Sequence, residues 1–131
     1  MKDWGKRRTQ MKTFIICPVR DVTQSERDEI RKYVLDLERQ GVSVHWPERD
    51  TNQDDKIGNN ICKQNKDAIL SADRIYVYYN PKSAGTLFDL GIAWAVGKPM
   101  TLINKVEPTD GSKSFNNVLL WWNSWEAKGD R

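Results

Sequence analysis

Short strand-like runs alternate with longer helical patterns along most of this chain. Residues 12–17, 42–46, 75–79 and 99–103 are rich in β-branched, aromatic and other apolar residues. Apolar residues recur at helical spacing over 23–40, 56–70, 83–97 and 114–126. Such alternation is typical of a parallel sheet with helices on both faces and right-handed crossovers. We therefore expect an α/β fold, a flavodoxin- or Rossmann-like three-layer sandwich with four to five mainly parallel strands.

The domain organisation that follows is simple. The chain has 131 residues, the usual size of one domain. Residues 1–11 are polar and predict a loose N-terminal tail, and residues 12–131 predict a single domain. We expect the strand order 2-1-3-4. Ligands of such sheets bind at the carboxyl ends of the strands, where the turns Pro18–Thr23 and Asn80–Thr86 meet.

Several local signals set the expected helix boundaries. Thr23 or Ser25 can cap the first helix, with Glu26 in its first turn, and Gly41 ends it. The segment 48–55 is polar without a period and predicts a loop. Its aspartates lack the glycine and closing glutamate of a calcium loop, so we expect Asp50, Asp54 and Asp55 to be solvated.

Composition excludes several classes of function. The 21 basic and 18 acidic residues leave a net charge of +3, too little to argue for nucleic acid or a membrane surface. One histidine and two distant cysteines make a zinc site implausible, and we expect no metal and no cofactor. No apolar run approaches the roughly 20 residues of a membrane span, and no signal peptide opens the chain. A cytoplasmic protein with reduced thiols is expected.

Asp89 is the strongest candidate for chemistry. It lies about one turn inside a helix whose other residues are mostly apolar. Ser83, Gly85 and Thr86 would open that helix after the third strand, and free N–H groups at a helix N-terminus attract anions. A carboxylate facing the same crevice can attack or stabilise an electrophilic carbon. A surface aspartate and a purely capping Ser83 are the alternatives.

Two further polar residues, Arg20 and Asn65, are expected near the same crevice at the carboxyl ends of the strands. Arg20 comes after the first strand and can bind a phosphate with two hydrogen bonds. The alternative is an exposed loop arginine without a ligand. Asn65 lies on the helix before the third strand and can aim into the crevice or simply face solvent. His45 lies in the second strand, where a packed histidine is favoured over a catalytic one.

The last predicted helix is unusually rich in tryptophan. Trp121, Trp122 and Trp125 fall on more than one of its faces. One face can pack on the sheet, and an exposed apolar remainder indicates a partner surface. We expect a homodimer or larger homo-oligomer through this helix, with stacking of one tryptophan on a nucleobase as the alternative.

Four segments together resemble the nucleoside 2-deoxyribosyltransferase family, including its relatives that hydrolyse nucleoside 5′-monophosphates. They are Ile16-Cys-Pro-Val-Arg20, the segment from Ile61 to Asp73, Ser83-Ala-Gly-Thr-Leu-Phe-Asp-Leu-Gly91, and Ala95-Val-Gly-Lys-Pro99. The resemblance implies cleavage or transfer at the N-glycosidic bond of a nucleoside or nucleotide. A carboxylate attacks the anomeric carbon as the base leaves, and water or a second base then takes the sugar.

The resemblance also assigns roles to residues. Asp89 stands where the family has its nucleophilic glutamate, and Asn65 where it has an assisting aspartate. Ser83 matches the monophosphate hydrolases, so Ser83 and Arg20 are expected to hold a 5′-phosphate, with Pro18, Gly85 and Thr86 beside it.

Family members also borrow residues from a neighbouring subunit near the last helix, for which Ser114, Asn116 and Asn117 are the candidates here. The two replaced carboxylates leave an alternative open, a nucleotide-binding or sensor module without turnover. A phospho-receiver domain is disfavoured, because Cys17-Pro18 and Asn80-Pro81 stand where its acidic residues would be.

Overall fold

The structure, a computed structural model, describes residues 10–127 and the side chains of residues 10–124. The expected loose tail falls mainly on residues 1–9, which lie outside this range. Within it, Gln10 donates from its side-chain amide to the Gly41 carbonyl at 2.6 Å. Ser43 donates its N–H to the Met11 carbonyl at 2.9 Å. Residues 10 and 11 therefore hydrogen-bond the segment that begins the second strand.

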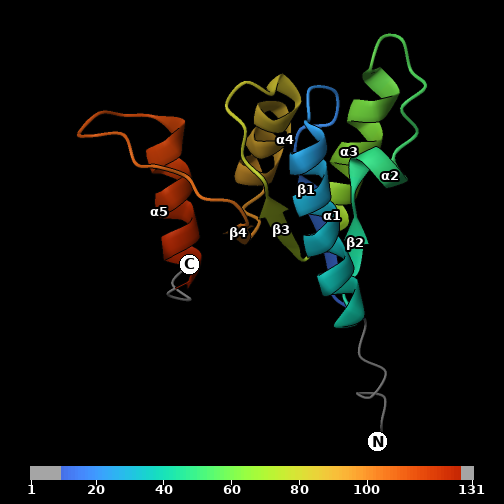
Figure 1. Ribbon diagram of the computed structural model, residues 1–131, viewed down its shortest axis with the longest axis horizontal. Coiled ribbons are helices and arrows are strands. Elements are labelled where there is room, and N and C mark those ends of the chain that lie inside the picture. Colours follow the sequence, from blue (N-terminus) through green and yellow to red (C-terminus); the bar gives the residue numbers. More distant parts are fainter. Residues whose placement is uncertain (1–9, 128–131) are drawn as a thin grey trace, which may run out of the picture.

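Four strands form one sheet, in which every neighbouring pair is parallel (Figure 1). They are β1 (Lys12–Ile16), β2 (Ser43–His45), β3 (Arg74–Val77) and β4 (Met100–Leu102). Their order is β2-β1-β3-β4, which confirms the predicted order. The α/β fold expected from the alternation is confirmed with it.

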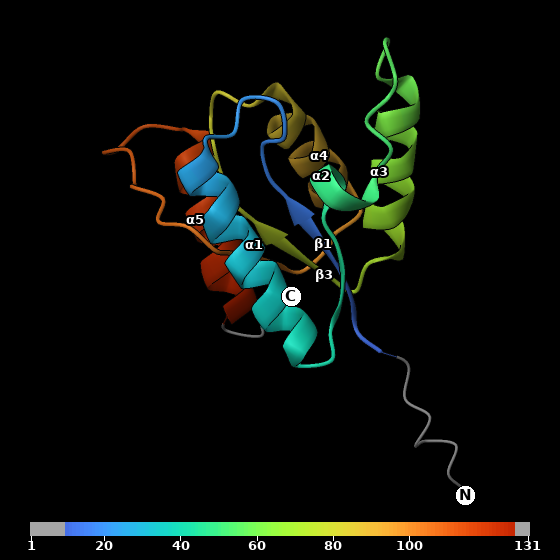
Figure 2. The same cartoon turned by 45° about the vertical axis from the view of Figure 1, so that its right-hand side comes forward.

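Residues 10–127 also form five helices: α1 (Gln24–Arg39), α2 (Pro47–Asp50), α3 (Asn59–Ser71), α4 (Ala84–Ala95) and α5 (Phe115–Ala127). Helix α1 lies on one face of the sheet, and α3 and α4 lie on the other (Figure 2). The residues of β1 explain the two layers, because successive side chains point to opposite faces. Phe14 and Ile16 pack in the cluster that contains residues of α3 and α4. Ile15 and Cys17 pack with α1.

Helix α5 lies beside β4, at one edge of the sheet (Figure 1). The N–H of Leu102 in β4 donates to the side-chain oxygen of Asn123 at 3.0 Å. The indole N–H of Trp122 donates to the Lys98 carbonyl at 3.2 Å. Trp122 also meets Trp94 of α4 edge to face, with ring centroids 5.1 Å apart. One aromatic face of α5 is thus packed against the rest of the domain, as expected.

The predicted ends of α1 are confirmed. Thr23, not Ser25, is the N-cap, and it forms a capping box with Glu26. The Thr23 hydroxyl accepts from the Glu26 N–H at 3.1 Å, and the Glu26 carboxylate accepts from the Thr23 N–H at 2.9 Å. Gly41 follows the helix with φ of 87°, a left-handed conformation that glycine adopts without strain.

Two boundaries differ from the sequence prediction. Part of the predicted loop is helix α2, which Pro47 begins with its preset φ and in which the Asp50 carboxylate accepts the Trp46 N–H at 2.9 Å. Helix α3 begins at Asn59 rather than at residue 56. The reason is Gly58, whose φ of 93° breaks the helical path. Ile57 lies before the helix and is 88% exposed.

No helix within residues 10–127 is long and apolar enough to cross a membrane.

Candidate functional site

Ser83 begins helix α4 just after the turn that follows β3. Its hydroxyl oxygen accepts from the Thr86 N–H at 3.2 Å and from the Thr86 hydroxyl at 2.9 Å. Because Ser83 Oγ accepts both bonds, its own proton stays available for a ligand oxygen. Thr86 is fully buried, and both of its donors serve the cap. The N-cap expected at Ser83 is present, and the Thr86 N–H that we expected to meet a ligand is already bonded.

Asp89 lies one and a half turns into α4, on its buried face. The buried residues of this helix are Thr86, Asp89, Leu90 and Ala93, which is the spacing of one helical stripe. The Asp89 side chain is only 8% exposed. Within residues 10–127, no hydrogen bond or ion pair is made by its carboxylate. A buried carboxylate without a partner is costly to the fold, and such groups cluster at functional sites.

Burial raises the pKa of Asp89 to about 7. The charged form is disfavoured because the carboxylate is withdrawn from water and no cation or donor compensates. Near neutral pH the group is therefore divided between its protonated and ionised forms. A carboxylate in this state is a stronger nucleophile and base than an ordinary aspartate, once it is ionised.

The Cys17 thiol lies within range of the charge of this carboxylate. Cys17 follows β1 and is buried. Burial, and then the charges of Glu48 and Asp89, raise the pKa of the Cys17 thiol to about 12. A thiol in this state is inert as a nucleophile. The effect of the Asp89 charge on Cys17 indicates that this carboxylate lies toward the carboxyl end of β1.

Asn65 lies on α3 and is buried, with 7% of its surface exposed. Its side-chain oxygen accepts the Thr51 hydroxyl proton at 2.8 Å. The Thr51 oxygen in turn lies 2.7 Å from Nε2 of His45. His45 is the last residue of β2, so this chain of contacts places Asn65 near the carboxyl end of the strand next to β1.

The other residues predicted around a 5′-phosphate have different surroundings. Arg20 is exposed in the turn after β1, and within residues 10–127 no acceptor or carboxylate pairs with it. Pro18 is fully buried in the same turn. Gly85 is exposed in the first turn of α4, and a Cβ built there would meet nothing within 4 Å. Packing inside the domain therefore does not require a glycine at this position.

The Asn117 side chain forms hydrogen bonds within its own loop rather than facing a ligand. Its side-chain oxygen accepts the Thr109 N–H at 2.9 Å, and its side-chain nitrogen donates to the carbonyls of Thr109 and Ser112 at 2.7 and 2.8 Å. These bonds hold the loop that leads into α5. Asn116 similarly donates to the Glu107 carbonyl at 2.8 Å. In this chain Asn117 stabilises its own loop and has no side-chain donor or acceptor group left unbonded.

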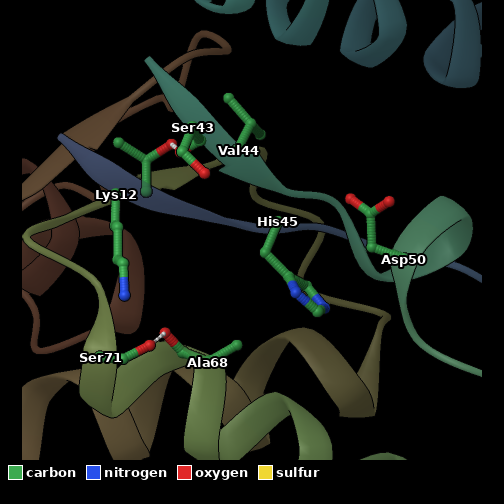
Figure 3. A pocket seen from close by; sticks show the side chains of 8 residues that line it. Lys12, Ser43, Val44, His45, Asp50, Ala68 and Ser71 are labelled. Carbon is green, nitrogen blue, oxygen red and sulfur yellow. Dashed lines mark hydrogen bonds between the residues drawn. The ribbon is translucent and has the colours of Figure 1, made fainter. Parts of the chain in front are cut away.

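A groove of about 290 Å³ lies between the start of the sheet and α3 (Figure 3). Its polar lining comes from Lys12, Thr13, Ser43, His45, Asp50 and Ser71. His45 projects from β2 into it (Figure 3). Neither Asp89 nor Asn65 lines this groove, whereas His45, which contacts Thr51, does.

The sequence of residues 20–119 matches the family model described as nucleoside 2-deoxyribosyltransferase. The chain belongs to this family. The match spans the elements from the turn after β1 into α5. The resemblance read from the four sequence segments is thereby confirmed at the level of the family.

Solved structures of this family share the fold. A 2-deoxyribosyltransferase from Bacillus psychrosaccharolyticus is 21% identical, with a TM-score of 0.60 over 82% of this chain and 89% of that chain. A CMP N-glycosidase from Clostridium botulinum is 24% identical, with a TM-score of 0.53 over 70% and 69%. A 2-deoxyribosyltransferase from Leishmania mexicana is 17% identical, with a TM-score of 0.57 over 87% and 97%. No curated protein matches the sequence significantly.

Sequence reasoning missed two residues of the candidate site. Thr51 lies inside the segment that the sequence predicts as a loop, and for His45 the sequence favours a packed or edge residue over a catalytic one. No sequence signal marks their contact with Asn65, because it joins side chains from three segments. Within residues 10–127, no group of three or more histidine, cysteine or acidic side chains is arranged to hold a metal ion.

Proposed function

We propose that this chain cleaves or transfers at the N-glycosidic bond of a nucleoside 5′-monophosphate, with Asp89 as the nucleophile. The observation that carries the proposal is the Asp89 carboxylate, buried and without a partner in the described residues, six residues after the Ser83 cap on the same helix. The family supplies the reaction class.

The first step uses the ionised form of Asp89. One carboxylate oxygen attacks C1′ of the sugar, and the C1′–N bond breaks with its electron pair leaving on the base. The base takes up a proton, and a glycosyl ester of Asp89 remains. The positive charge that develops on the sugar favours a carboxylate beside it, in a site from which water is largely excluded.

The second step releases the enzyme. Water, or the nitrogen of a second base, attacks C1′ and gives up a proton, and the ester bond to Asp89 breaks. Asn65 orients the sugar or the incoming water, since an amide can donate and accept hydrogen bonds but cannot serve as a base. The two steps together retain the configuration at C1′.

The 5′-phosphate is proposed from the groups around the start of α4. The Ser83 proton and the Gly85 N–H are donors without acceptors in the described residues, and Arg20 is an exposed cation that can reach across from the neighbouring turn. Space for a Cβ at Gly85 suits the close approach of an anion. A CMP N-glycosidase among the solved structures of similar fold supports the same substrate class.

The test is base release from a panel of nucleoside 5′-monophosphates and the matching free nucleosides, with and without a second base as acceptor. We expect free base from at least one monophosphate, and loss of that activity in Asp89→Ala. Asp110→Asn, which changes an exposed aspartate of the 105–114 loop, is the matched control. Binding of a monophosphate with no base release by the wild type would favour a sensor module instead.

We also propose that the chain is a homo-oligomer. Helices α4 and α5 together carry exposed large apolar residues at Phe88, Trp94, Phe115, Val118 and Trp121. Trp94 and Trp121 adjoin, with ring centroids 6.2 Å apart. An exposed apolar surface of this kind is typical of a subunit interface. Light scattering after gel filtration measures the oligomer directly.

A further inference from the structure

Three polar side chains from different segments form a continuous chain of contacts beside the candidate site. His45 ends β2, Thr51 follows α2, and Asn65 lies in the middle of α3. His45 Nε2 lies 2.7 Å from the Thr51 oxygen, and the Thr51 hydroxyl donates to Asn65 Oδ1 at 2.8 Å. Thr51 is 4% exposed and Asn65 is 7% exposed, so water competes little for these bonds.

The direction of the bonds can be derived from the protons available. A threonine hydroxyl has one proton, and that of Thr51 is donated to Asn65. Its oxygen can therefore only accept from His45, which requires a proton on Nε2. The His45 ring stacks on Phe14, with centroids 5.2 Å apart and planes at 13°. The stacking holds the ring in the plane from which Nε2 reaches Thr51.

The contacts also determine which end of the Asn65 amide is left for a ligand. Its oxygen is bonded to Thr51, and its side-chain nitrogen has no acceptor within residues 10–127. Among the described residues, the Trp46 indole nitrogen is the only fully buried side-chain N or O atom without a hydrogen-bond partner. The unpartnered Asn65 nitrogen is therefore not fully buried and remains accessible to a small ligand atom. Two N–H donors on a buried side chain are thus free to meet a ligand atom.

We infer that Thr51 and His45 are positioning residues that fix the Asn65 amide, so that its N–H₂ end rather than its oxygen faces the substrate. An asparagine amide is close to symmetric in shape and can rotate by half a turn unless its hydrogen bonds forbid it. With the His45 proton on Nε2, the rotation would leave the only proton of Thr51 without an acceptor. His45 keeps Thr51 in this role by filling the acceptor side of the hydroxyl.

This arrangement has a consequence for recognition. The site presents a fixed donor at Asn65, so it suits an acceptor atom of the substrate, such as a sugar hydroxyl oxygen or a ring nitrogen of the base. A released amide could instead turn its oxygen, an acceptor, toward the substrate. The inference rests on the proposed function, and the kinetic experiment below depends on that function. The hydrogen bonds of His45 and Thr51 can also be measured by NMR without any turnover.

The kinetic arm compares Thr51→Val with Thr51→Ser. Valine keeps the shape but removes the hydroxyl, and serine restores it. We expect Thr51→Val to lower kcat by about 3- to 10-fold with a smaller change in KM, as one hydrogen bond to a positioned group is lost. Thr51→Ser should recover most of that loss. Thr109→Val, an exposed threonine in the 105–114 loop, is the control for the substitution itself.

A double-mutant cycle separates positioning from simple support of the fold. In an Asn65→Ala background the Thr51→Val change should have no further effect on kcat, because the group it positions is gone. A merely structural Thr51 would lower activity by the same factor in both backgrounds, and that result would overturn the inference.

The second arm uses nitrogen NMR of the labelled protein. The wild type should show a neutral His45 with its proton on Nε2, and Thr51→Val should change that signal. The side-chain amide of Asn65 should give one sharp pair of N–H signals that broadens in Thr51→Val. A wild-type His45 with its proton on Nδ1 would refute the inference even in an active enzyme. Correct signals with no base release would instead refute the proposed function alone.

Discussion

Replacing Asp89 by asparagine should make the protein more stable while it abolishes base release. Asparagine keeps the shape of the side chain and removes the charge. The carboxylate is buried without a partner in the described residues, and its pKa is raised from 3.8 to about 7 by burial alone. Ionised Asp89 therefore opposes folding, and the neutral amide does not.

The size of the effect follows from the shift of the pKa. A shift from 3.8 to about 7, at about 1.36 kcal/mol per unit, corresponds to a penalty on the order of 4 kcal/mol. Both states bind the proton below about pH 3, so the penalty is absent there. It grows as the unfolded chain ionises first, reaches roughly 2 kcal/mol near pH 5.4, and is complete above pH 7. Stability of the wild type relative to the variant should fall with rising pH through this window.

The assay is denaturant unfolding of wild type, Asp89→Asn and the control Asp110→Asn, each from pH 4 to pH 8. The exposed control should change the free energy of unfolding by less than about 0.5 kcal/mol at every pH. The Asp89→Asn variant should exceed the wild type by only about 0.6 kcal/mol at pH 4 and by increasingly more toward pH 8. Its base release should fall by more than about 10³-fold. Equal stability at pH 8 would refute the reasoning, since it would mean that the carboxylate is solvated or paired.

Three further outcomes are expected. The kcat/KM for base release should rise with pH up to about 7 and then level off, because the nucleophile must lose its proton; a rate that falls across this range would exclude Asp89 as nucleophile. Ser83→Ala should lower stability by about 1 kcal/mol through loss of the cap, and should weaken calorimetric binding of a 5′-monophosphate more than that of its free nucleoside; equal weakening would remove Ser83 from the phosphate site. Trp121→Ser combined with Phe115→Ser should shift the protein toward monomer in light scattering, because both side chains are exposed apolar surface; an unchanged mass would place any interface elsewhere.

The layered fold could be predicted from the sequence because each of its signals is local. Alternating strand-like and helical runs are enough to give a parallel sheet covered on both faces, and the Thr23 cap and Gly41 are visible in the residues themselves. Helix α2 could not be predicted, since its one turn has no period and depends on the Asp50 carboxylate reaching back to Trp46.

The burial of Asp89 could be predicted from the sequence only in part. Its sequence neighbour Phe88 is 56% exposed, so apolar flanks alone do not bury a carboxylate. The informative signal is that Asp89 shares one helical face with Thr86, Leu90 and Ala93. The contacts of Asn65 were not readable. They depend on the packing of β2, α2 and α3, which no spacing along the chain encodes.

The hydrogen bond between Leu102 and Asn123 has a consequence for how copies of this chain can meet. A bare strand edge invites a strand from another molecule to extend the sheet. At β4 the Leu102 N–H is not available for such pairing, because it donates to the Asn123 side chain of α5. Subunits that associate at this end must do so through helix side chains. A chain shortened before α5 would uncover the edge, and we would expect it to aggregate rather than to form a defined monomer.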